Sequence, residues 1–233
     1  MVENLLDSNL YYNFKGIQIY HGDCLEILPL LSSVDLIITD PPYGIDFQSS
    51  RRIERCRLPK IKGDTGIDGR FIEVCFEKLK DTGSFYLFTR WDVYPEWLSL
   101  LPKNARIRNC IIWDRVVHGM GDLKNTYAPT YDMILFAIKG KHNLRGKRPK
   151  DVIRSKRVDP EKLLHPAQKP IDVIYQLIQS SSDKGDIVLD PFMGSGTTLR
   201  AAKDLGRNAI GIEIEKKYCE IAIKRLQQEV IVF

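Results

Sequence analysis

Two short segments of this chain combine residue types that could carry out chemistry. The first is Asp40-Pro41-Pro42-Tyr43, and the second is a glycine-rich run from Asp190 to Thr198. In the first, the Asp40 carboxylate and the Pro41 carbonyl are hydrogen-bond acceptors on a turn that two prolines make rigid. Two such acceptors suit an amine on an aromatic base, because they concentrate electron density on its nitrogen, and the ring of Tyr43 offers a face for stacking an extruded base. The segment therefore indicates a site that activates an exocyclic amine, unless the prolines merely end a strand.

The glycine-rich run has the features of a cofactor loop. Its glycines let the backbone approach a ligand closely, and a helix is predicted to begin just after them, so that free N–H groups face the ligand. Glu213 lies 23 residues beyond Asp190, at the end of the next predicted strand, where a carboxylate can accept hydrogen bonds from both hydroxyls of a ribose. Leu199 stands where the dinucleotide pattern Gly-x-Gly-x-x-Gly requires its third glycine, so that pattern is not matched.

Alternating strand and helix patterns must position these segments. Strands are predicted at 17–20, 34–39, 84–89, 107–113, 131–138, 186–189 and 209–214. Helices are predicted at 24–31, 68–80, 95–101, 171–180, 196–205 and 216–229. This alternation predicts one α/β domain over residues 1–233, built on a doubly wound, mostly parallel seven-stranded sheet. Both polar segments directly follow a predicted strand, and such sheets bind ligands beyond the carboxyl ends of their strands.

Positive charge is concentrated in two loops, although the net charge of the chain is only +5. Between residues 139 and 157, nine Lys or Arg residues stand against one acid, Asp151. A second stretch, 44–66, carries six basic residues against three acids and directly follows the Asp40 segment. Two such loops favour a nucleic-acid partner over a merely solvated surface. The residues expected to contact it are Arg51, Arg52, Arg55, Arg145, Lys147, Arg148 and Lys150.

Composition argues against several classes of protein. No apolar run approaches the roughly 18 residues that span a bilayer, and the first residues lack the pattern of a signal peptide. The five cysteines are scattered without paired spacing, which predicts reduced thiols in a cytoplasmic protein and no metal site.

The motifs together resemble those of the S-adenosylmethionine-dependent DNA amino-methyltransferases, which modify adenine N6 or cytosine N4. The run from Asp190 to Thr198 is similar to the family's Asp-Pro-Phe-x-Gly-Ser-Gly-Thr-Thr motif, and the run from His165 to Pro170 is similar to its His-Pro-x-Gln-Lys-Pro element. The Asp40 segment is similar to the catalytic motif and precedes the cofactor loop, which is the order of the β-type permutation. The resemblance spans about residues 16–226 and implies a Rossmann-like methyltransferase fold. One departure is the recognition segment, the basic insert at 140–164, which is short for the family.

The resemblance implies a role for each motif residue. The catalytic site would consist of Asp40, Pro41, Pro42 and Tyr43. S-adenosylmethionine would be held by Asp23, Asp190, Pro191, Phe192, Gly194, Ser195, Gly196, Thr197, Thr198, Glu213, His165 and Lys169. For three of these the residues alone leave another role open: Asp23 as a helix cap, His165 as a structural histidine and Lys169 as a solvated helix start.

The leading hypothesis is a site-specific methyltransferase that acts on adenine N6 of double-stranded DNA after the target base is flipped out. Asp40 favours adenine, because cytosine-N4 enzymes of the family more often carry Ser at that position. The alternatives are cytosine N4, an RNA substrate, a protein glutamine side chain, for which Asn usually precedes Pro-Pro-Tyr, and a non-enzymatic nucleic-acid-binding module. The resemblance also implies a homodimer, whereas a cognate restriction enzyme, a phage setting and a housekeeping role all stay open.

Overall fold

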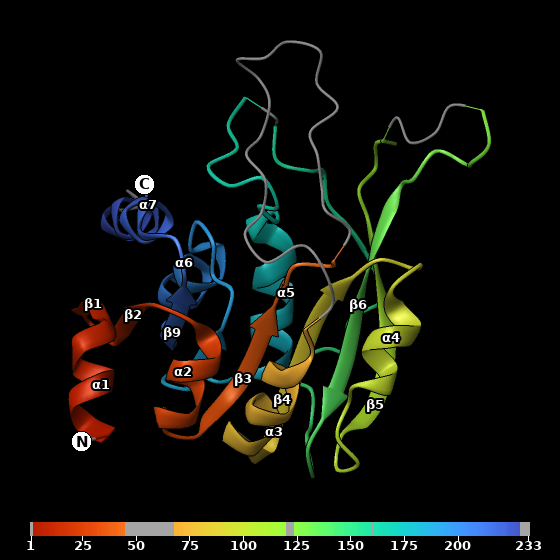
Figure 1. Cartoon of the computed structure of the whole chain (residues 1–233). Coiled ribbons are helices and arrows are strands. Elements are labelled where there is room, and N and C mark those ends of the chain that lie inside the picture. Colours follow the sequence, from red (N-terminus) through yellow and green to blue (C-terminus); the bar gives the residue numbers. More distant parts are fainter. Residues whose placement is uncertain (1, 45–67, 120–123, 160, 229–233) are drawn as a thin grey trace.

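A sheet covered by helices on both faces organises the chain (Figure 1). The structure is a computed structural model that describes residues 2–44, 68–119, 124–159 and 161–228. Three residues predicted to contact nucleic acid, Arg51, Arg52 and Arg55, lie outside the described residues. No helix in the described ranges is both long and apolar enough to cross a membrane.

The strands and helices alternate over most of the chain. The strands are β1 (Leu10–Phe14), β2 (Ile17–His21), β3 (Val34–Thr39), β4 (Leu79–Thr89), β5 (Arg106–Asp114), β6 (Tyr131–Ile138), β7 (Val152–Arg154), β8 (Ile187–Asp190) and β9 (Asn208–Glu213). The helices are α1 (Val2–Asn9), α2 (Cys24–Ile27), α3 (Arg70–Lys78), α4 (Tyr94–Ser99), α5 (Ile171–Ser181), α6 (Thr197–Asp204) and α7 (Lys216–Gln227), with a 3₁₀ turn η1 (Leu28–Leu30) after α2.

The sheet has the order β1-β2-β9-β8-β3-β4-β6-β5-β7. Five neighbouring strands, from β2 to β4 in this order, run parallel, and β6 is antiparallel to both β4 and β5. All seven predicted strands are present, so the predicted doubly wound, mostly parallel fold is confirmed. The carboxyl ends of the parallel strands meet at one edge of the sheet, and the amino end of β6 reaches the same edge.

Two short strands were not predicted, and they raise the number of strands in the described sheet from seven to nine. At one margin β1 pairs with β2 through a two-residue turn at Lys15 and Gly16, where φ is +48° and +78°. Positive φ at both positions is the geometry of a type I′ hairpin turn. At the other margin, β7 has only three residues, all taken from the basic insert, and pairs parallel with β5. Neither strand has enough residues to show a clear alternation in the sequence.

Each face of the sheet has its own apolar core. Helices α2, α3 and α4 cover one face with side chains such as Ile27, Phe71 and Trp97. Helices α5, α6 and α7 cover the other, where Val173 and Leu199 pack against the strands. Because both faces are buried, the central strands β3 and β8 are largely apolar; apart from Asp35 near the amino end of β3, their polar side chains stand at the carboxyl edge.

Candidate active site

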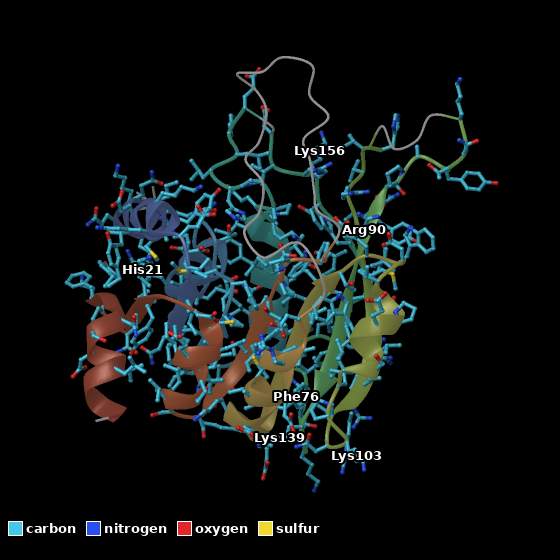
Figure 2. All side chains as sticks on the ribbon, in the orientation of Figure 1. His21, Phe76, Arg90, Lys103, Lys139 and Lys156 are labelled. Carbon is cyan, nitrogen blue, oxygen red and sulfur yellow. The ribbon has the colours of Figure 1, made fainter. Side chains whose placement is uncertain are left out.

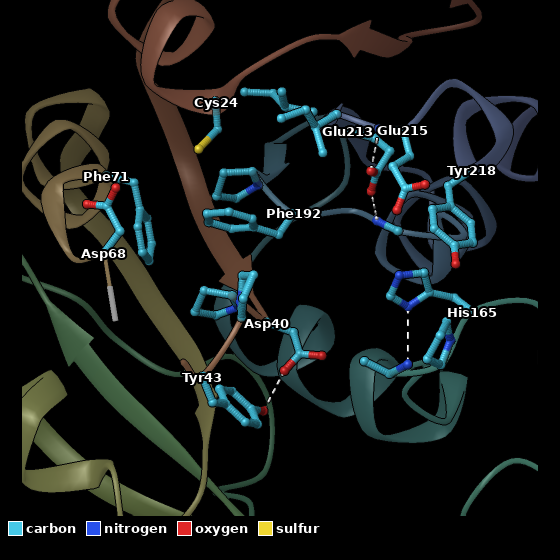
Figure 3. A pocket seen from close by; sticks show the side chains of 18 of the residues that line it. Cys24, Asp40, Tyr43, Asp68, Phe71, His165, Phe192, Glu213, Glu215 and Tyr218 are labelled. Carbon is cyan, nitrogen blue, oxygen red and sulfur yellow. Dashed lines mark hydrogen bonds between the residues drawn. The ribbon is translucent and has the colours of Figure 1, made fainter. Parts of the chain in front are cut away.

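A cavity of about 560 Å³ opens at the carboxyl edge of the sheet (Figure 3). The strand ends and the loops that follow β2, β3, β8 and β9 line it, together with the segment before α5. A volume of this size accommodates a small organic ligand. The two polar segments singled out in the sequence are thereby brought to one site.

Asp40 stands on the cavity wall immediately after β3, with both oxygens of its carboxylate engaged. The Tyr43 hydroxyl donates a 2.6 Å hydrogen bond to Oδ1, and the Lys169 ammonium forms an ion pair with Oδ2 (Figure 3 shows the Tyr43 bond). Burial and the nearby Asp40 charge raise the pKa of Tyr43 well above its ordinary value, so Tyr43 stays a neutral donor. Pro41 and Pro42 line the same cavity. The predicted catalytic segment is thus assembled at one wall.

Lys169 is buried rather than solvated, because only 13% of its side chain is exposed. Its ammonium also lies 5.2 Å from the centre of the Phe88 ring, and it donates to the Ala167 carbonyl. The alternative of a solvated helix start is therefore excluded for Lys169. Lys169 is one of the predicted cofactor residues, and its ion pair with Asp40 brings it into contact with the predicted catalytic segment.

Glu213 ends β9 and holds the glycine-rich loop against the cavity. Its Oε2 accepts a 3.0 Å hydrogen bond from the Gly194 amide, and its Oε1 accepts a 2.8 Å bond from the Glu215 amide. Burial raises the pKa of Glu213, and the backbone donors oppose that effect. Each carboxylate oxygen has a further lone pair, so the side chain can accept additional hydrogen bonds from a ligand.

The glycine-rich loop reaches the cavity with only part of its length. Pro191, Phe192 and Gly194 line it, and a Cβ added at Gly194 would lie 3.3 Å from the His165 ring. Gly196 has φ +74° and packs against α7, where an added Cβ would lie 2.7 Å from the Ala222 Cβ. Packing therefore accounts for this glycine. Four other predicted cofactor residues line a separate cavity of about 50 Å³ that also reaches Asp40 and Lys169; they are Asp190, Ser195, Thr197 and Thr198.

Burial changes the ionisation of two residues beside this loop. It raises the pKa of Asp190 to about 7, although the Phe192 amide donates a 3.1 Å hydrogen bond to its carboxyl group. It lowers the pKa of His165 to about 4, so the ring is neutral at pH 7. The Ala167 amide donates to His165 Nδ1 at 3.2 Å, and the ring meets Tyr218 edge to face (Figure 3).

Asp23 is placed so that both of its proposed roles are compatible. Its side chain caps α2 by accepting a 2.9 Å hydrogen bond from the Leu25 amide, and the residue also lines the cavity. The helix cap and a ligand contact are compatible because a carboxylate has several acceptor sites.

Seven charged residues of the cavity wall were missed in the sequence: Asp68, Arg70, Arg90, Arg115, Asp132, Arg157 and Glu215. Arg90 follows the last residue of β4, Arg115 follows the last residue of β5, Asp132 is the second residue of β6, and Arg157 belongs to the basic insert but was not selected from it. A signal existed for Arg90, which directly follows a predicted strand, and for Arg115, which lies two residues beyond one. Asp132 could be placed only once β6 was known to be antiparallel.

The predicted DNA-contacting residues of the insert do not gather at this cavity. Arg145 Nε donates to Asp183 Oδ2 at 3.1 Å, and its backbone amide donates to the Ser180 carbonyl. Ser180 lies in the last turn of α5 and Asp183 lies between α5 and β8, at the edge opposite the cavity. Lys147, Arg148 and Lys150 are exposed on the loop between Arg145 and β7. Their role in DNA binding stays a prediction, and the structure gives it no support.

Comparison with known proteins decides the family. A family described as "DNA methylase" matches residues 34–224. The chain belongs to this DNA methylase family. Among named relatives, the Type II methyltransferase M2.DpnII of Streptococcus pneumoniae is 30% identical over 97% of this chain and 95% of its own length. The DNA adenine methyltransferase YhdJ of Escherichia coli K12 is 31% identical over 89% and 82%. The solved structure of an M1.HpyAVI-SAM complex superposes with a TM-score of 0.69 and 30% identity, covering 90% of this DNA methylase and 100% of that chain.

The residues of this DNA methylase fit S-adenosylmethionine as the cofactor. Glu213 offers acceptors for ribose hydroxyls, and Asp23 offers one for an adenine amine. Phe192 and Ile214 supply apolar wall on which a purine can pack, and the missing Cβ of Gly194 leaves room beside His165. Among the described residues, no group of three His, Cys, Asp or Glu side chains could hold a metal ion.

Proposed function

We propose that this DNA methylase transfers a methyl group to N6 of adenine in double-stranded DNA, at a specific sequence and on a flipped-out base. The observation that carries the proposal is the Asp40 carboxylate, which stands at the wall of a cavity that also contains Glu213 and the glycine-rich loop. Acceptor and cofactor residues are thus held in one enclosed space. A relative at 31% identity is named a DNA adenine methyltransferase, which supports adenine over cytosine.

Asp40 has two tasks in the reaction. S-adenosylmethionine supplies a methyl group on a positively charged sulfur. Asp40 accepts a hydrogen bond from the target amine, which directs the nitrogen lone pair away from the aromatic ring. After transfer the nitrogen carries one proton too many, and Asp40 is the carboxylate placed to take it. Tyr43 and Lys169 each occupy one oxygen of Asp40, and each oxygen keeps a further lone pair that can accept a hydrogen bond from the amine.

Tyr43 and the prolines fix the position of the amine. The Tyr43 hydroxyl is tied to Asp40, so the ring is held at the cavity wall, where a base can lie against it. Two consecutive prolines limit movement of the backbone that carries Asp40. Holding the amine in place supplies much of the rate enhancement in such a reaction, because no covalent intermediate with the protein is needed.

The test is to express the protein in cells whose DNA lacks methylated adenine and to sequence that DNA by a single-molecule method. N6-methyladenine at one recurring sequence is the expected result, and it would identify base, position and target sequence together. Unmodified DNA would contradict the proposal. A second copy of the chain stays a prediction from the family resemblance, and a cognate restriction enzyme stays open.

A further inference from the structure

Arg115 is a buried cation without a full set of partners. Only 8% of the residue is exposed, and no acceptor among the described residues takes the hydrogen of its Nε. Its Nη1 lies 3.4 Å from Asp132 Oδ1, which is a long ion pair. Arg115 lines the main cavity together with Asp40 and Tyr43. A guanidinium held out of water with a donor unused is costly unless something else binds it.

The backbone keeps Arg115 in this position. Its amide donates to the Thr130 carbonyl at 2.9 Å, which ties the end of β5 to the segment before β6. The next residue, Val116, has φ +68°, a conformation that β-branched residues rarely adopt. The Val116 amide is fixed by a 2.8 Å hydrogen bond to Asp114 Oδ1. Strained backbone of this kind persists where the surrounding structure enforces it, often at a binding site.

Three more arginines line the same cavity: Arg70, Arg90 and Arg157. Arg90 is paired with Asp92 through bonds of 3.1 and 2.6 Å, whereas Arg157 is exposed and comes from the basic insert. Burial lowers the pKa of Arg115, Asp132 opposes that effect, and the charges of Arg157 and Arg90 lower the pKa further. These two guanidinium groups therefore repel Arg115, and an anion bound beside it would offset the repulsion.

We propose that Arg115 and Arg157 bind a phosphate of the target nucleotide when its base enters the cavity. The inference rests on the proposed function, since it takes the ligand to be DNA. Phosphate is the anion that DNA carries, and the planar guanidinium matches two of its oxygens. Asp40 would then hold the amine end of the flipped nucleotide, and the arginines would hold its backbone end. The subsite would position the nucleotide regardless of the sequence around it.

The experiment uses the whole protein and duplexes that carry its target sequence. One phosphate beside the target adenine at a time is replaced by an uncharged methylphosphonate, and DNA affinity is measured for the unaltered protein and for Arg115→Met. Replacement of one of these phosphates should lower the DNA affinity of the unaltered protein about tenfold or more. Arg115→Met should bind unmodified DNA about as weakly as the unaltered protein binds that methylphosphonate duplex. The same methylphosphonate should not lower the DNA affinity of Arg115→Met any further. Arg106→Met is the matched control, because Arg106 is exposed at the other end of the same strand.

Several outcomes would overturn the inference. One is that Arg115→Met binds DNA as the unaltered protein does. Another is that each methylphosphonate weakens both proteins equally. A third is that Arg115→Met loses affinity for S-adenosylmethionine instead, which would assign Arg115 to the cofactor carboxylate. If Arg115→Met does not fold, as judged by its melting temperature, the exposed Arg157→Met undergoes the same comparison. Absence of DNA methylation by the unaltered protein would instead refute the proposed function.

Discussion

Lys169 and Asp40 form an ion pair within the cavity, although 129 positions separate them in the sequence. Lys169 belongs to the segment before α5, and Asp40 directly follows the strand β3. The two side chains are only 13% and 18% exposed. Because Tyr43 holds the other oxygen, the Asp40 carboxylate has a fixed orientation before any substrate binds. Lys169 is thus a positioning residue for the proposed catalytic carboxylate.

Replacement of Lys169 by Met should slow methyl transfer by about tenfold or more, because Asp40 would keep only Tyr43 as a partner and lose its orientation. The rate is measured in a single turnover with saturating DNA and cofactor. Lys103→Met, at the opposite edge of the sheet, serves as the control (Figure 2). A variant with the normal single-turnover rate and a loss confined to cofactor affinity would assign Lys169 to the cofactor instead.

Replacement of Glu213 by Gln should weaken cofactor binding by roughly 1.5–3 kcal/mol, the usual cost of losing hydrogen bonds to a charged acceptor. Gln keeps the size of the side chain and one acceptor oxygen, so the Gly194 amide can still donate to it, whereas the bond from the Glu215 amide is lost. Calorimetry of cofactor binding measures the effect, and Glu220→Gln on α7 is a control of the same chemistry. Unchanged affinity in Glu213→Gln would remove Glu213 from the ribose site.

The two ends of the basic insert should differ in their effect on DNA binding. In the first group, Arg157 lines the cavity, and Arg154 and Lys156 lie at or just beyond the end of β7, at the same edge of the sheet (Figure 2 labels Lys156). In the second group, Arg145 is bound to Asp183 at the opposite edge. Replacing the first three with Ala should flatten the slope of log affinity against log salt by up to about 3 units, at roughly 0.9 per phosphate contact. Replacing Arg145, Lys147, Arg148 and Lys150 should change the slope little. The reverse result would restore the second group as the DNA-binding residues.

Stability should fall in acid partly because of His165. Burial lowers the pKa of His165 to about 4, below the value of about 6.5 in an unfolded chain. Between these two values the unfolded chain takes up a proton that the folded protein does not, so the free energy of unfolding decreases as pH falls from 6.5 to 4. The decrease attributable to His165 is at most about 3 kcal/mol. It is measured by urea unfolding across this range, with NMR of the His165 ring as the direct check; a ring that titrates near pH 6.5 would contradict the expectation.

The sequence predicted most of the sheet and the two polar segments of the site, which begin at Asp40 and Asp190. This success has a physical reason. Strands β3 and β8 are buried on both faces, so the carboxylates that follow their apolar runs stand out, and these are Asp40 just after β3 and Asp190 at the end of β8. Local patterns of this kind need no knowledge of distant contacts. Site residues could therefore be predicted from the sequence where they lie on a single strand or on the loop that directly follows it.

What the sequence could not show depends on partners far along the chain. Lys169 forms its ion pair with Asp40, which lies 129 positions away, and Asp132 joins the cavity only because β6 is antiparallel. Net charge selected Arg145 for DNA contact, but charge counts do not reveal which edge of the sheet a loop follows. Gly196 looked like a cofactor glycine, whereas its close approach is to Ala222 of α7.

The most direct test of the proposed adenine activity is mass spectrometry of nucleosides from DNA treated with the protein and S-adenosylmethionine. The expected product is N6-methyladenine with little or no N4-methylcytosine, and Asp40→Ala should yield neither while binding the cofactor within a few fold of normal. Chiefly N4-methylcytosine, or substantial product from Asp40→Ala, would contradict the assignment of Asp40 to the adenine amine.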